Sequence, residues 1–217
     1  IPVPVAMARK CVSASVTENE FRACVETYQI IVGVIVFVAS FARPDVAFAA
    51  HFLARFLTRP GEPHVALARR VLGYLSRTDE LAITYRADGA DLSAAFKPLE
   101  SPTNLPHMFA DTDHGVDRSI SGWMFMFASA AVTWAVRAQQ SPSLSSAEAE
   151  LYGLSTAVAD LLTTFHAFED MGVHFEAPIS CISDSRGARL IAADSAVAAR
   201  ARHIHRRWYF VRYHRDE

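Results

Sequence analysis

The second half of the chain contains three apolar segments that end in, or lead into, carboxylate side chains. They carry the motifs FADTD at residues 109–113, LSSAEAELY at 144–152 and CISDS at 181–185. Two of the acids, Asp111 and Asp184, follow strand-like runs, and Glu150 lies in a helical pattern. Because α/β sheets place ligands at the carboxyl ends of adjacent strands, these acids are expected to converge. Converging carboxylates are what two hard cations need for phosphodiester hydrolysis.

The helical pattern around Glu150 predicts which way its side chain points. Residues 145–171 read as one long helix, which begins with a serine N-cap and is followed by Gly172. Leu154 and Val158 recur at intervals of four from Glu150, so these three residues share one helix face. If the apolar residues face the sheet, the glutamate faces it too.

Each acid also has a purely structural interpretation. Asp184 could cap a following helix, and Asp113 could be a turn residue before Gly115. Glu148 and Glu150 could simply favour a helix N-terminus, where negative charge is stabilised. The occurrence of all the acids in this order, on these elements, favours a functional cluster.

Composition limits the classes of function that fit. With 217 residues, 51% hydrophobic and 20% charged, the chain can build a packed core in one large or two small domains. A net charge of −2 is not that of a general nucleic-acid binder, so such binding needs a local basic patch. Basic residues do crowd the C-terminus, either as such a patch or as a solvated helix face: Arg200, Arg202, Arg206, Arg207, Arg212 and Arg215, with His203, His205 and His214.

The cysteines and the start of the chain bear on location. Cys11, Cys24 and Cys181 are odd in number and show no C-x-x-C spacing, which favours free thiols in an intracellular protein, cytoplasmic or nuclear. No secretory signal is seen. The first residue is Ile rather than Met, which is typical of a fragment or a processed product.

The most apolar stretch, residues 28–42, is predicted to be a buried core helix, although its β-branched residues leave a strand possible. It is shorter than the roughly 20 residues that span a bilayer, so no membrane span is expected.

The first half reads as mainly helical and the second half as a mixed sheet. Residues 1–20 read as extended, 21–57 as two apolar segments split at 43–45, and 65–78 as an amphipathic helix. A short strand at 81–85 and a linker with a domain boundary at 86–104 follow. Strands are then expected at 105–110, 121–128, 131–136 and 179–183, with helices at 145–171 and 198–213. A meander followed by helix, strand and helix indicates a mixed α/β sheet.

At these motifs the chain resembles the ribonuclease H domain of copia-type retrotransposon polyproteins. The family's D-A-D-W-A-G and S-T-S-G-Y match residues 111–115 and 119–123, its I-S-W matches 132–134, its L-S-S-T-E-A-E-Y matches 144–151, its C-D-N-Q-S-A matches 183–188, and its R-T-K-H-I-D-I-R-Y-H-F matches 200–210. The first half resembles the segment between polymerase and ribonuclease H, at residues 28–33, 43–49, 53–56 and 64–75.

The resemblance implies a fold, an activity and a set of residues. The fold would be an α/β, ribonuclease H-like mixed sheet with flanking helices at 105–217, preceded by a mainly helical connection segment at 1–104. The activity would be cleavage of the RNA strand of an RNA–DNA hybrid with Mg²⁺ or Mn²⁺ at a two-metal site. The implied catalytic metal ligands are Asp111, Glu150 and Asp184, with Asp113 and His205 as auxiliary candidates, and with Arg200, Arg202, Arg206 and Arg207 binding nucleic acid.

The chain departs from the family pattern at several points. His205 replaces the aspartate of H-I-D, and Ser185 and Arg186 replace the Asn and Gln after the third acid. The usual last strand and last aspartate of the ribonuclease H fold come after the position of Glu217. These departures leave an alternative function open: a domesticated, catalytically silent subunit that holds protein partners in a larger assembly.

Overall fold

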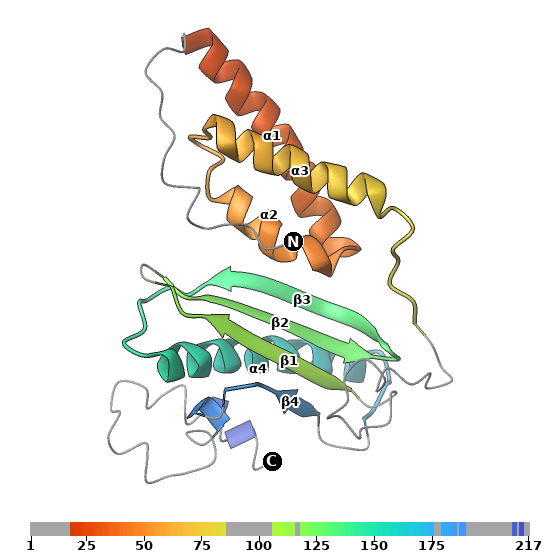
Figure 1. Cartoon of the computed structure of the whole chain (residues 1–217). Helices are drawn as coiled ribbons and strands as arrows, with labels where there is room; N and C mark the ends of the chain where they lie inside the picture. The colour runs from red at the N-terminus through yellow and green to blue at the C-terminus, as the bar shows by residue number, and fades with distance from the viewer. Residues whose placement is uncertain are drawn as a thin grey trace. The chain divides into compact units, whose positions relative to one another are not determined.

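A computed structural model shows the chain as two compact units, Ile1–Ile83 and Thr84–Glu217 (Figure 1). The residues that it describes are 18–85, 106–115, 118–175, 179–185, 187–189, 210–211 and 213–214. The N-terminal unit is helical and the C-terminal unit is built around a sheet. The predicted linker at 86–104 and most of the predicted last helix at 198–213 lie outside the described residues.

The described residues of the N-terminal unit form helices that follow one another along the chain. They are α1 (Glu18–Phe41), the short 3-10 helix η2 (Pro44–Val46), α2 (Ala47–Ala54) and α3 (Glu62–Arg77). Pro44 opens η2, as expected for a residue whose φ is already helical and whose missing N–H is not needed there. The predicted break at 43–45 and the predicted amphipathic helix at 65–78 are therefore confirmed.

One face of α1 forms the core of this unit. Tyr28, Val32 and Ile35 are fully buried, at the helical spacing of four and three, and they join Leu53 of α2 and Ala68 of α3 in one cluster. The buried Tyr28 hydroxyl donates a hydrogen bond to the Leu53 carbonyl oxygen at 2.7 Å. This contact satisfies the hydroxyl group and ties α1 to the end of α2.

The opposite face of α1 corrects the prediction of a buried core helix. Ile30 is 70% exposed and Phe41 is 71% exposed, and Val34 and Phe37 between them are also exposed. Among the described residues of this unit, η2, α2 and α3 cover only one side of α1, so apolar composition alone overstated its burial. Within the described residues, no helix is both long and apolar enough to cross a membrane.

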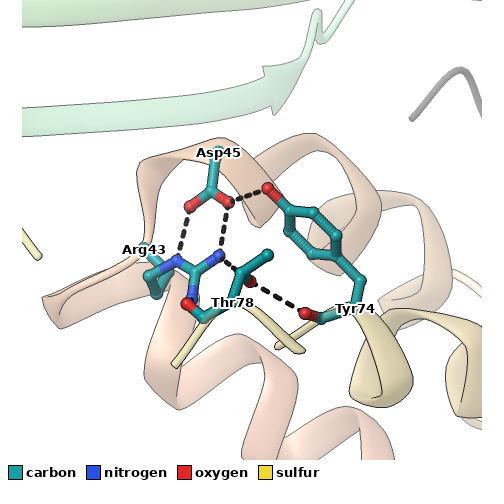
Figure 2. A network of polar contacts seen from close by, with 4 residues as sticks. All are labelled: Arg43, Asp45, Tyr74 and Thr78. Carbon is teal, nitrogen blue, oxygen red and sulfur yellow. Dashed lines mark hydrogen bonds and ion pairs between the residues drawn. The ribbon is translucent and has the colours of Figure 1, made fainter. Parts of the chain in front are cut away.

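A buried arginine closes the corner between α1 and α3 (Figure 2). Arg43, only 7% exposed, donates from Nε and Nη2 to the two carboxylate oxygens of Asp45 at 2.9 and 2.8 Å, and from Nη1 to the Thr78 carbonyl oxygen at 2.7 Å. The Tyr74 hydroxyl donates to the same carboxylate at 2.8 Å. The Arg43 guanidinium holds the pKa of Asp45 below its usual range. Arg43 and Asp45, which lie where α1 ends, therefore also anchor the C-terminal end of α3.

The C-terminal unit contains a four-stranded mixed sheet of order β3-β2-β1-β4. The strands are β1 (His107–Asp113), β2 (Ile120–Phe127), β3 (Ala130–Ala138) and β4 (Ser180–Ile182). β1 and β2 pair antiparallel, as do β2 and β3, whereas β4 pairs parallel to β1. The predicted α/β fold with a mixed sheet is confirmed, and it is compatible with a ribonuclease H-like arrangement.

Helix α4 (Ser146–Asp170) crosses one face of this sheet (Figure 1). Buried and more exposed side chains alternate along β1, which explains this packing. Met108 and Ala110 are buried beneath the helix, whereas Asp111 is exposed. Leu154 and Val158 of α4 belong to the same core, as predicted from their spacing. The helix therefore carries its first turns directly over the end of β1.

Two predicted strand boundaries differ from the structure. Residues 81–85 form no strand, because this extended segment pairs with no strand of the described chain; Tyr85 instead donates its hydroxyl to the Ala131 carbonyl oxygen at 2.8 Å. β1 was expected to end at Asp111 but continues to Asp113, because Ile120 of β2 still pairs there.

Candidate metal centre

The register of the sheet brings the two aspartates side by side. The last pair between the parallel strands β1 and β4 joins Phe109 to Ile182. Continuing both strands by two residues places Asp111 opposite Asp184, because parallel strands advance together. The Asp111 carboxylate also accepts a hydrogen bond from the Thr112 backbone N–H at 2.8 Å.

The segment after β4 shows that another residue performs the capping role considered for Asp184. The Ser185 hydroxyl accepts a hydrogen bond from the Ala188 N–H at 3.1 Å, at the start of the helical residues 187–189. Ser185 N–H itself donates to the Ser183 hydroxyl at 3.3 Å. The serines thus satisfy the local backbone, and the exposed Asp184 carboxylate is available for another role.

The two glutamates at the start of α4 have different roles. Ser145 caps the helix by accepting from the Glu148 N–H at 3.2 Å, and Glu148 accepts from the Leu144 N–H at 2.7 Å. Both contacts tie Glu148 to the backbone at the start of the helix, so Glu148 serves the helix N-terminus. Glu150 faces the sheet instead, and the structure places it with the two aspartates.

Asp111, Glu150 and Asp184 form one cluster. Each offers one carboxylate oxygen, and these oxygens all lie within 4.8 Å of one another. The three acids come from different parts of the fold. Asp111 lies in β1, Glu150 lies in α4, and Asp184 is the second residue after β4. An all-oxygen donor set of this kind suits hard cations such as Mg²⁺ and Mn²⁺ rather than softer metals.

The electrostatics of the cluster favour a cation. Burial raises the pKa of Glu150 from its ordinary value of 4.5 to about 7, with further contributions from the negative charges of Asp111 and Asp184. The three carboxylates therefore repel one another when all are ionised. A divalent cation at the centre would replace this repulsion with attraction, so the residues present fit a metal of that class.

This raised pKa predicts how the metal-free protein responds to pH. The unfolded chain ionises Glu150 near pH 4.5 and the folded chain near pH 7, so stability is lost progressively as pH rises through that interval. Glu150→Gln removes this loss. We expect the two proteins to melt alike near pH 4 in EDTA, where Glu150 is mostly protonated in both the folded and the unfolded chain. At pH 8 the variant should be more stable by on the order of 1 kcal/mol, or about 2–4 °C in Tm. Parallel melting curves across this range would contradict the assignment.

The other predicted site residues fall into two groups. Asp113 lies at the end of β1 and is exposed, but it is not part of the cluster that the described residues form. The remaining candidates lie outside the described residues: His205, Arg200, Arg202, Arg206 and Arg207.

Sequence reasoning missed one residue that allows the cluster to form. A Cβ built at Gly153 would overlap the Thr112 Oγ1 atom and would lie 2.9 Å from the Ser121 Oγ atom. The absence of a side chain at this position therefore lets α4 approach β1 and β2 closely. A glycine inside a helical pattern is a sequence signal for such close approach, because it costs helix stability.

The structure thus defines an α/β protein with a cluster of three carboxylates at the end of its sheet that could hold a metal ion. The retrovirus-related Pol polyprotein from transposon TNT 1-94 of Nicotiana tabacum is 27% identical over 186 residues, which are 85% of this chain and 13% of that polyprotein. A transposon Ty5-1 protein of Saccharomyces cerevisiae is 34% identical over 111 residues, covering 49% of this chain and 32% of that protein.

A third relative carries a different name. The secreted RxLR effector protein 161 of Plasmopara viticola is 31% identical over 134 residues, which cover 59% of this chain and 84% of that protein. No protein-family model and no solved structure matches the chain. The Pol polyproteins align over 85% of this chain, which spans 12–13% of their own length, and these relatives support a copia-type Pol region.

Proposed function

We propose that this chain is the region of a copia-type Pol polyprotein that hydrolyses the RNA strand of RNA–DNA hybrids. Residues 105–217 would form the ribonuclease H-like domain, and residues 1–104 the connection segment before it. The observation that carries the proposal is the convergence of Asp111, Glu150 and Asp184, from three separate elements, to within 4.8 Å. A structural protein gains nothing from holding three repelling carboxylates together.

The chain's own residues would have distinct tasks in this reaction. Mg²⁺ or Mn²⁺, when bound, would activate a water molecule and stabilise the leaving oxygen of the phosphodiester. Asp111 and Asp184, on adjacent strands, would hold the cations rigidly at the sheet. Glu150 would complete the ligand set from the helix, and its carboxylate would be ionised more readily once a cation is bound. Asp113 and His205 are auxiliary candidates.

Nucleic-acid binding is proposed from charge. The chain as a whole has a net charge of −2, so phosphate contacts need a local source of positive charge. The arginines at 200, 202, 206 and 207 supply such a source in the sequence. Contacts of this kind would hold the hybrid by its backbone without reading its bases.

Hydrolysis of a labelled hybrid tests the proposal. We expect the protein to cut the RNA strand with Mg²⁺ or with Mn²⁺, to leave the DNA strand intact, and to be inactive in EDTA. Asp184→Asn should abolish cleavage because it removes one ligand of the cluster, whereas Asp170→Asn, the same change at an exposed position of α4, should retain it. A well-folded protein that cuts in neither metal would overturn the proposal and favour a catalytically silent role.

A further inference from the structure

The loop between β3 and α4 begins with two glutamines, of which the first is buried and the second is exposed to solvent. Gln139 is 2% exposed, whereas Gln140 beside it is exposed. A primary amide carries two N–H donors and an acceptor oxygen, and burying it is unfavourable unless these groups are paired. The position of Gln139 therefore requires partners, and the partners show what the side chain does.

The Gln139 side chain joins three parts of the C-terminal unit. Its Nε2 atom donates to the Ala149 carbonyl oxygen in the first turn of α4 at 2.7 Å, and to the Ser121 hydroxyl of β2 at 2.9 Å. Its Oε1 atom accepts from the Ser143 hydroxyl in the loop at 2.8 Å. Helix, sheet and loop are thus fixed to one buried amide.

These contacts continue to the metal cluster on both sides. The Ser121 hydroxyl also accepts a hydrogen bond from the Thr112 hydroxyl at 3.1 Å. Thr112 directly follows Asp111, and Ala149 directly precedes Glu150. One continuous set of hydrogen bonds therefore links the backbone beside one carboxylate to the backbone beside another, through Ser121 and Gln139.

We propose that Gln139 is a positioning residue that sets the distance between Glu150 and Asp111, and so the affinity of the cluster for its cations. The inference rests on the proposed function, since it assigns Gln139 a role at that same site. Like-charged carboxylates move apart unless the scaffold holds them, and a cation binds tightly only to ligands fixed to within about 0.5 Å. Gln139 contacts no metal ligand side chain and acts through the helix backbone.

Metal affinity measured without substrate tests this role. Gln139→Met keeps the length of the side chain and removes its hydrogen bonds, and Gln140→Met is the matched control at the exposed neighbour. We expect Mn²⁺ titrations to show about 10–100-fold weaker binding for Gln139→Met, the usual cost of losing a residue that orients metal ligands. Gln140→Met should bind like the native protein. Hybrid cleavage by Gln139→Met should need correspondingly more Mn²⁺ and recover to within a few-fold at saturation.

A merely structural role gives a different result. It would lower the Tm of Gln139→Met in EDTA but leave the Mn²⁺ affinity of the folded protein, and the Mn²⁺ dependence of cleavage, at native values; that result would overturn the inference. If Gln139→Met does not fold, Ser121→Ala removes a hydroxyl from the same set of hydrogen bonds and should also weaken Mn²⁺ binding. Native Mn²⁺ affinity in Ser121→Ala would then contradict the inference. A native protein that binds no Mn²⁺ would overturn the proposed function itself.

Discussion

Gly153→Ala is expected to destabilise the C-terminal unit, even though alanine is the better helix former. The new methyl group would overlap Thr112 Oγ1 and crowd Ser121 Oγ, and both atoms belong to short, buried side chains that cannot move away. Overpacking of this kind costs about 1–3 kcal/mol, which exceeds the gain of up to about 1 kcal/mol from helix propensity. Urea unfolding of the metal-free protein measures the difference.

Two further variants make this prediction specific. Gly73→Ala makes the same change inside α3, where a Cβ would meet no atom within 4 Å, and it should stabilise the protein by about 0.5–1 kcal/mol. Thr112→Ala removes the atom that the new methyl group would meet, so the double variant should be more stable than the sum of the two single changes predicts. Additive effects would show that the contact between α4 and β1 is looser than the structure indicates.

Gly153 also shows where sequence reasoning was sufficient and where it was not. The strand-like run before Asp111 predicted β1, and the helical spacing of Leu154 and Val158 predicted which face of α4 meets the sheet. Those patterns say which faces meet but not how closely. A glycine in a helical pattern signals a close approach, but the two small side chains of the sheet that it meets are identified only in three dimensions.

The acids illustrate the same limit. Their positions near strand ends and in the first turns of a helix predicted convergence, and the parallel register of β1 and β4 explains it for the aspartates. The choice of Glu150 over Glu148 followed from the resemblance, because the ribonuclease H helix motif has its glutamate directly before an apolar residue, here Leu151. Gln139 gave no such signal, since a glutamine in a loop is ordinarily solvated and only packing buries it.

The failed predictions have a common cause. The segment 81–85 and the outer face of α1 were judged from local pattern alone. An extended apolar segment becomes a strand only if a neighbouring strand supplies hydrogen bonds, and an apolar helix face is buried only if another element covers it. Neither condition is local, and within the described residues neither is met.

Asp111→Asn is expected to have opposite effects on activity and on stability. Asparagine keeps the shape of the side chain and its oxygen acceptor but removes one negative charge from the cluster of Asp111, Glu150 and Asp184. Cleavage of the RNA–DNA hybrid should fall by more than about 10³-fold, since removing one member of a catalytic group that acts as a unit costs at least that much. Mn²⁺ binding without substrate should weaken in parallel.

The metal-free variant should at the same time melt at a higher temperature than the native protein. Removing one charge relieves repulsion that Asp111 exerts on Glu150, and it should move the pKa of Glu150 back toward its ordinary value. Thermal melts in EDTA at pH 8, with Asp170→Asn as the control, measure this gain. A misfolded variant loses activity and stability together, so loss of cleavage with a raised Tm can only come from the charge. Retained cleavage, or a lower Tm than that of the native protein, would show that Asp111 is not a ligand of the proposed metal centre.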